Sequence, residues 1–155
     1  MPTDWTSPGI AALAAEVFGA QLGLAQRYAE LLTGPGIERG LVGPREPGRI
    51  WERHLLNCAA LSPLLPPDAR VVDVGSGAGL PGLVLAVRRP DLRVDLVESL
   101  RRRTDFLAEG VEGLGLGDRV RVDRGRVEDP EVVARVGQAQ WVTARAVAPL
   151  DRLAS

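Results

Sequence analysis

The chain has 155 residues, 45% of them hydrophobic, which is enough for one hydrophobic core and makes a single compact unit the expectation. The net charge of −1 creates no overall field that attracts nucleic acid, so RNA contacts must come from a local patch. A single cysteine, Cys58, excludes an internal disulfide and a cysteine-based zinc site, and no metal site is expected. With no signal peptide and no span of about twenty apolar residues evident, we expect a cytoplasmic protein without membrane contact.

The first part of the chain is predicted to be helical. Apolar residues at helical spacing indicate one long amphipathic helix over residues 8–33, ended by a Gly-Pro-Gly sequence. Residues 37–48 form an irregular connection with one helical turn, and a second helix follows over residues 49–61 before several prolines. Residues 1–66 are therefore expected to form a helical cap on a domain that occupies residues 67–155.

The segment over residues 70–82 has the pattern of a strand, a tight turn and a helix. The β-branched run Val71–Val74 precedes four glycines, and apolar residues 83–87 continue at helical spacing. Without a Cβ, the backbone can turn sharply and let a ligand lie against its N–H groups near a helix N-terminus. This glycine turn, residues 75–82, is the principal candidate ligand site.

Two ligand classes use such a turn. Residues 77–82 match the dinucleotide pattern G-x-G-x-x-G, whereas the segment that starts at Asp73 matches the D-x-G-x-G-x-G turn of S-adenosylmethionine (SAM) methyltransferases. The register favours SAM, because Asp73 can order the loop or face a cationic ligand but would repel a pyrophosphate. An NAD site and a turn that binds no ligand are the alternatives.

The second predicted strand, residues 93–98, ends in an acidic residue. Glu98 lies about twenty residues beyond the turn, where a carboxylate can accept both hydroxyls of a ribose; the alternative is an ordinary residue ahead of the next helix. That helix, residues 100–114, carries Arg101, Arg102 and Arg103 in its first turns, where the helix dipole disfavours cations. The three arginines indicate an anionic partner or a solvated face.

The remaining elements repeat the alternation of strand and helix. A third strand over residues 119–123, a loop at 126–129, a short helix at 131–136 and a fourth strand over 140–144 follow. This order predicts an α/β, Rossmann-like parallel sheet of strand order 3-2-1-4, with a ligand crevice at the carboxyl ends of its strands. The residues expected at those ends are Asp73, Gly75, Glu98, Glu128 and Arg145.

With these residues in view, the chain resembles the bacterial small-subunit rRNA guanine-N7 methyltransferases, the glucose-inhibited division protein B group. The resemblance extends from about Tyr28 to Leu150 and covers most of the chain. It rests on Arg53-His54-Leu55-Leu56, Val72 to Gly82, Glu98-Ser99, Arg102-Arg103 before Phe106-Leu107, Gly125-Arg126-Val127-Glu128, and Ala144-Arg145-Ala146-Val147-Ala148-Pro149-Leu150.

The resemblance implies a class I SAM-dependent methyltransferase that acts on a guanine of 16S rRNA or the small ribosomal subunit. Glu98 would then bind the ribose, Val127 and Glu128 the adenine end, and Arg145 the methionine end or the incoming nucleotide. His54 and Arg145 are the implied catalytic candidates, although His54 also fits a half-buried helix histidine. The implied SAM contacts are Asp73, Gly75, Gly77, Leu80, Glu98, Val127, Glu128 and Arg145; the implied RNA contacts are Arg53, Arg101, Arg102, Arg103 and Arg126.

Guanine N7 already carries a lone pair, so its methylation needs orientation and no general base. Methylation of an amino group typically uses an Asn/Asp-Pro-Pro-aromatic loop after strand four, but the sequence at that position is Ala-Arg-Ala-Val. Methylation of a pyrimidine carbon needs a cysteine nucleophile in the same part of the fold, whereas Cys58 lies on an N-terminal helix. A non-catalytic SAM- or RNA-binding fragment and an NAD-dependent oxidoreductase remain as alternatives.

Length is the main departure from the family pattern. Methyltransferases of this class have seven strands, so four predicted strands indicate a C-terminally truncated form. Strand four, with Trp141 and Val142, would then be an unpaired apolar edge through which the chain associates with itself.

Overall fold

The sheet has four parallel strands in the order β3-β2-β1-β4. The computed structural model describes residues 2–145, and its strands are β1 (Arg70–Val74), β2 (Arg93–Glu98), β3 (Val120–Arg124) and β4 (Trp141–Ala144). The predicted fold class and strand order are confirmed, and each strand begins and ends within one residue of its predicted position.

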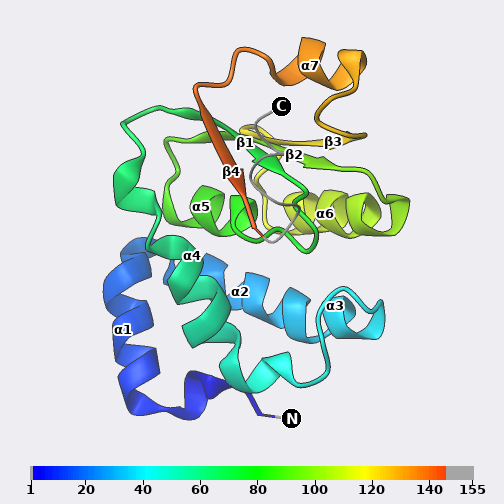
Figure 1. Cartoon of the computed structure of the whole chain (residues 1–155). Helices are drawn as coiled ribbons and strands as arrows, with labels where there is room; N and C mark the ends of the chain where they lie inside the picture. Colours follow the sequence, from blue (N-terminus) through cyan, green and yellow to red (C-terminus); the bar gives the residue numbers. More distant parts are fainter. Residues whose placement is uncertain (1, 146–155) are drawn as a thin grey trace.

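Helices cover both faces of the sheet. Two of them, α5 (Gly82–Arg88) and α6 (Arg101–Gly113), lie between the sheet and the cap, and α7 (Pro130–Val136) lies on the opposite face (Figure 1). Because side chains alternate along a strand, Val71 packs into the main core, whereas Val72 packs with α7. Both faces of the central strands are therefore buried, as expected for a parallel sheet.

The cap is built from α1 (Pro8–Phe18), α2 (Leu22–Thr33) and α3 (Pro35–Glu38). The prediction of one long helix over residues 8–33 is wrong. Gly19 has φ +52° and opens a 3₁₀ turn at Gly19–Gln21, after which α2 runs in a different direction from α1 (Figure 1). The apolar spacing indicated which face is buried but not the break, which a glycine with positive φ makes possible.

The second cap segment departs from a regular α-helix. A 3₁₀ turn at Glu46–Arg49 leads into a π-helix at Ile50–Leu56 and then α4 (Asn57–Ala59), with a last 3₁₀ turn at Ser62–Leu64. A further 3₁₀ turn, Asp4–Thr6, lies at the start of the described chain, and the Asp4 carboxylate accepts hydrogen bonds from the N–H groups of Trp51 and Glu52. π-helical segments are uncommon and frequently occur at functional sites.

One apolar core joins the cap to the sheet. Tyr28 and Ile50 from the cap share it with Leu83 of α5 and Leu96 of β2, and all four side chains are almost fully buried. The burial of these apolar side chains away from water is the main contribution that stabilises the packing of the cap against the sheet.

The helical run Pro8–Glu38 is long and apolar enough to cross a membrane by length and composition, with a mean hydropathy of 1.3 over its most apolar window. The sequence analysis did not expect such a run. In the structure it is broken at Gly19, and the side chains of Ala25, Tyr28 and Leu32 pack into the core. Its second half is therefore a core element of this fold.

Candidate active site

The candidate site is a cavity of about 1390 Å³ at the carboxyl ends of β1 and β2, with one wall supplied by the cap. The glycine turn contributes Gly75, Gly77 and Leu80 to its lining. The structure thus brings together, around one space, segments that the sequence analysis placed at separate strand ends. The other predicted residues that line it are Glu98, Arg103, Arg126, Val127, Glu128, Arg145 and His54.

Backbone hydrogen bonds to β2 hold the start of the glycine turn in place. The N–H groups of Gly75 and Ser76 both donate to the Val97 carbonyl, at 2.8 and 3.1 Å. Gly79 has φ +100°, and a Cβ there would lie 2.6 Å from Leu83 Cδ1. Only glycine fits such a position, so the turn stays close to the helix beneath it.

Tyr28, which lies within the helix predicted over residues 8–33 and was not among the predicted site residues, supports the turn from the cap. Its hydroxyl donates to the Ala78 carbonyl at 2.5 Å, and its side chain is buried. Burial raises the pKa of this phenol well above its usual range, so the group remains a donor at physiological pH. The spacing of 50 residues between the partners left no local signal for this contact.

Asp73 is absent from the cavity lining, which corrects its expected place among the ligand contacts. Its side chain is fully buried; Oδ2 accepts from the Gly82 N–H at 3.1 Å and Oδ1 from the Thr143 hydroxyl at 2.9 Å. Of the two roles expected for it, the geometry is that of ordering the loop. Burial raises the pKa of this carboxyl to about 6, against the lowering effect of its hydrogen bonds.

Glu98 lies at the end of β2 with its carboxylate on the cavity wall and nearly all of its surface buried. Oε1 accepts from the Gly77 N–H at 3.0 Å, and Oε2 accepts from the Leu100 N–H at 2.8 Å, just ahead of α6. Arg103 lies 3.6 Å from Oε1. An ionised carboxylate has about four acceptor positions, so Glu98 retains capacity for ligand hydroxyls while it fixes the turn.

The loop after β3 forms the next part of the wall. Arg126, Val127 and Glu128 line the cavity, and the Arg126 N–H donates to Asp129 Oδ2 at 2.9 Å. The Glu128 side chain is largely exposed, and its carboxylate lies 4.0 Å from the Arg126 guanidinium. The backbone of this loop is thus fixed while its charged side chains remain accessible.

The cap supplies one wall of the cavity, of which the sequence predicted only His54. Leu41, Val42 and Ile50 supply apolar surface, and Glu46 and His54 supply polar atoms. His54 Nε2 lies 2.6 Å from Glu46 Oε2. Only His54 among these five was a predicted site residue, because a residue of an irregular connection such as Glu46 carries no pattern that marks it.

Arg145 follows β4 and also lines the cavity. Its guanidinium contacts Cys58 Sγ at 3.5 Å and donates to the Arg53 carbonyl at 3.4 Å. Burial raises the pKa of the Cys58 thiol to about 11, which leaves it protonated and unreactive. Residues 146–150 of the family motif lie outside the described residues.

The predicted RNA contacts fall into two groups. Arg53, Arg101 and Arg102 are exposed and do not line it, whereas Arg126 and Arg103 do. Arg101 lies 3.9 Å from Asp105 of the same helix. Arg53, Arg101 and Arg102 are therefore open to solvent outside the cavity lining, whereas Arg103 and Arg126 belong to its wall.

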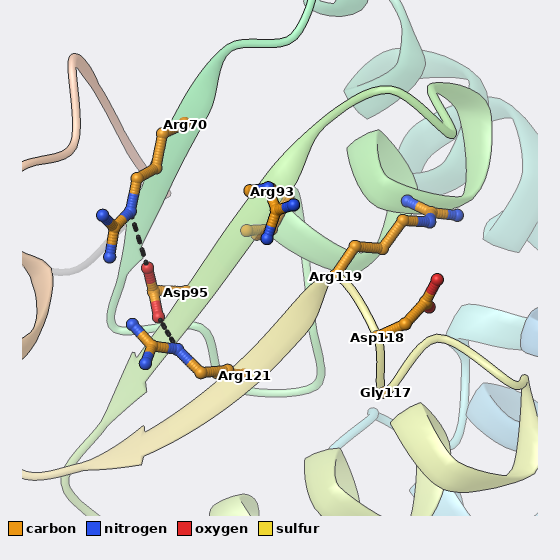
Figure 2. Close-up of a pocket in the computed structure, with 8 residues that line it drawn as sticks. Arg70, Arg93, Asp95, Gly117, Asp118, Arg119 and Arg121 are labelled. Atoms are coloured by element: carbon orange, nitrogen blue, oxygen red, sulfur yellow. Dashed lines mark hydrogen bonds and ion pairs between the residues drawn. The ribbon is translucent and has the colours of Figure 1, made fainter.

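A second cavity, of about 280 Å³, lies at the amino ends of the strands (Figure 2). Arg70 and Arg121 both face Asp95 there, at 3.7 and 3.0 Å. Arg119 donates to the Ala86 carbonyl at 2.6 Å. Each of these three guanidinium groups has a partner within the protein, and the cavity lies at the edge of the sheet opposite the candidate site. Within residues 2–145, no group of three or more His, Cys, Asp or Glu residues could hold a metal ion.

The parallel sheet, the glycine turn and the acidic end of β2 define the Rossmann-like fold of class I SAM-dependent methyltransferases. Two solved structures share this fold. The C-terminal domain of precorrin-6Y C5,15-methyltransferase from Rhodobacter capsulatus has a TM-score of 0.51 and 20% identity, over 63% of this chain and 54% of that one. Precorrin-6y C5,15-methyltransferase from Geobacter metallireducens GS-15 has a TM-score of 0.52 and 14% identity, over 72% and 54%.

The chain belongs to the family described as GidB, rRNA small subunit methyltransferase G, whose model matches residues 21–155. Curated relatives called ribosomal RNA small subunit methyltransferase G include one from Salinispora arenicola, 60% identical over 99% of this chain and 65% of its own length. Another, from Mycolicibacterium gilvum, is 57% identical over 91% of this chain and 61% of its own length. The chain thus spans less than two thirds of the length of these relatives.

Proposed function

We propose that this chain forms the cofactor-binding part of a SAM-dependent methyltransferase that acts on N7 of a guanine in 16S rRNA. The observation that carries the proposal is the convergence of the glycine turn and the Glu98 carboxylate on one large cavity. The naming of the relatives as small-subunit rRNA methyltransferases supports the choice of substrate class.

The residues of the cavity fit the proposed cofactor. SAM supplies a methyl group on a positively charged sulfur and also carries an ammonium, a ribose and an adenine. Glu98 offers acceptor positions for the ribose hydroxyls, Gly75 and Gly77 let a ligand approach the backbone closely, and Leu80 supplies apolar surface to the wall. Val127 and Glu128 would contact the adenine end. Asp73 would act indirectly, since its carboxylate holds the turn to α5 and β4.

Methylation at N7 asks of the protein orientation and exclusion of water rather than proton transfer. Arg145 and His54 lie on the cavity wall, where they can contact the target nucleotide. Arg145 is held toward the cap by Cys58 and the Arg53 carbonyl, so its position depends on the packing of the cap against β4. We assign both residues to base positioning, and no general base is required.

The proposed partner is 16S rRNA, alone or in the small ribosomal subunit, and the proposed location is the cytoplasm. Arg103 and Arg126 line the cavity, Arg53, Arg101 and Arg102 are exposed, and all five would contact phosphates. Such contacts release counterions, so RNA binding should weaken steeply as salt rises.

Calorimetric titration with S-adenosylhomocysteine tests the cofactor assignment, with NADH as the comparison ligand. Glu98→Gln keeps the size of the side chain but removes the charged acceptor, and we expect a loss of affinity of about tenfold or more. Glu112→Gln, on the exposed side of α6, is the matched control and should bind as the parent chain does. Binding of NADH in place of S-adenosylhomocysteine would refute the proposal, and binding without methyl transfer would indicate a non-catalytic fragment.

RNA contact is tested separately. Replacing Arg101 and Arg102, which are exposed and lie outside the cavity lining, by Ala should weaken binding of a 16S rRNA fragment and reduce its salt dependence, while leaving S-adenosylhomocysteine affinity nearly unchanged. Arg93→Ala, an exposed arginine at the amino end of β2, is the control. Equal loss of RNA and cofactor binding would contradict the assignment.

A further inference from the structure

A nitrogen atom near the cap wall of the candidate site is buried without a hydrogen-bond partner. His54 lines the cavity, and its Nε2 is bonded to Glu46 at 2.6 Å. Its other ring nitrogen, Nδ1, is inaccessible to solvent and has no partner within the part of the chain that the structure describes. Such atoms are rare because burial removes their hydrogen bonds to water.

The partner of His54 is itself held in place. Glu46 accepts from Arg49 Nη2 at 2.9 Å and from Arg49 Nε at 3.2 Å, and both residues belong to the 3₁₀ turn that precedes the π-helix. The hydrogen bond from His54, followed by those from Arg49, lowers the pKa of Glu46. Glu46 is thus an ionised carboxylate whose direction is fixed by a second side chain.

An ionised carboxylate only accepts hydrogen bonds, so the short contact requires a proton on His54 Nε2. In the neutral imidazole the second nitrogen then carries a lone pair and is an acceptor. Glu46 therefore determines not only where the ring lies but also which of its nitrogens can accept.

We infer that Glu46 is a positioning residue that holds His54 with its proton on Nε2, so that Nδ1 accepts an N–H of the target base. This inference rests on the proposed function. The Watson–Crick edge of guanine carries the N1–H and N2 amino donors, and N7 lies on the opposite, Hoogsteen side. A guanine held at the cap wall by its Watson–Crick edge would present N7 away from the cap. Adenine carries no hydrogen at N1, so an Nδ1 placed to accept the N1–H of guanine would meet a lone pair there, and the adenine N6 amino donor lies where guanine has its O6 acceptor.

Contact with a base requires a small movement of the ring, because Nδ1 is covered by protein in the structure. The hydrogen bond between Nε2 and Glu46 would be kept during that movement, so the ring would turn about Nε2. His54 is therefore the residue that touches the base, and Glu46 acts through it.

The tautomer can be observed directly, because His54 is the only histidine in the chain. Imidazole ¹⁵N NMR of the chain should show the ring proton on Nε2 and a lone pair on Nδ1. Glu46→Ala should shift the ring toward the tautomer mixture of free histidine, in which Nδ1 carries the proton in part, whereas Glu46→Gln, which keeps an acceptor oxygen, should retain the proton on Nε2. Glu52→Ala removes an exposed carboxylate from the same helical run and should leave the ring unchanged. A proton on Nδ1, or the same tautomer mixture in Glu46→Ala, would overturn the inference.

Base contact is measured on the same samples, by adding guanosine monophosphate in the presence of S-adenosylhomocysteine. The Nδ1 resonance should move with guanosine monophosphate and not with adenosine monophosphate, and Glu46→Ala should lower guanosine monophosphate affinity about tenfold. Unchanged affinity, or no movement of Nδ1 once S-adenosylhomocysteine is bound, overturns the inference. Failure of the parent chain to bind S-adenosylhomocysteine refutes instead the proposed function, whatever the tautomer. If Glu46→Ala does not fold, the tautomer of His54 in the parent chain and the response of its Nδ1 resonance to the two nucleotides still test the inference.

Discussion

The hydrogen bond between Tyr28 and the Ala78 carbonyl is the contact through which the cap supports the glycine turn. Tyr28→Phe removes only the hydroxyl, leaving the ring and its packing in the core. The Ala78 carbonyl then lies beneath a buried phenyl ring with no donor from the cap. This substitution isolates one polar contact between elements 50 residues apart.

The burial of this hydrogen bond determines how much stability Tyr28→Phe should lose. A typical hydrogen bond contributes roughly 0.5–1.5 kcal/mol, and an acceptor left unpaired in a buried place costs about 1–3 kcal/mol. The Tyr28 side chain is 1% exposed, so water cannot readily replace the hydroxyl. We expect Tyr28→Phe to lower the free energy of unfolding by about 2 kcal/mol and, for a chain of this size, the melting temperature by roughly 4–8 °C.

Urea unfolding followed by tryptophan fluorescence measures the stability change, and amide hydrogen exchange shows where it acts. Exchange at Gly77, Ala78 and Gly79 should accelerate more than exchange in β2. Thr33→Val is the matched control, because it also removes one hydroxyl hydrogen bond from α2, to the Ala29 carbonyl at 2.9 Å, without touching the turn. If both variants lose the same stability and leave exchange in the turn unchanged, the turn does not depend on the cap.

Three further predictions follow from other contacts. Burial raises the pKa of Asp73 from 3.8 to about 6, so the folded state binds more protons than the unfolded state between these values; stability should fall by about 3 kcal/mol as pH rises through this window. Urea unfolding at pH 4 and 7 should show this loss in the parent chain and not in Asp73→Asn, and matching profiles would contradict it. Gly82→Ala places a Cβ 2.5 Å from Asp73 Oδ2, which should cost about 1–3 kcal/mol, whereas Gly23→Ala in α2 meets no atom within 4 Å and should stabilise by about 0.5–1 kcal/mol. Equal effects of the two glycine changes on the melting temperature would argue against close packing under the turn. Val142 on β4 is 69% exposed, so sedimentation should detect self-association that Val142→Lys reduces; a monomer at high concentration would exclude pairing through that edge.

Local patterns in the sequence determined the sheet and the turn. A β-branched run before closely spaced glycines specifies strand, turn and helix because each element depends on residues near one another in the chain. The alternation of strands and helices indicated a doubly wound parallel sheet, and the observed order β3-β2-β1-β4 is that of such a sheet. Glu98 could be placed at the cavity for the same reason, since a carboxylate that ends a parallel strand lies at the edge where ligands bind.

The tertiary structure decided which atoms face the cavity and what supports it. Periodicity assigns a residue to a face of an element but does not identify its partners across the fold. The inward turn of the Asp73 carboxylate depends on the Gly82 N–H and the Thr143 hydroxyl, the latter 70 residues away. Likewise, Tyr28 beneath the turn and Glu46 beside His54 are set by the packing of the cap on the sheet, which the distribution of apolar residues within single helices does not specify.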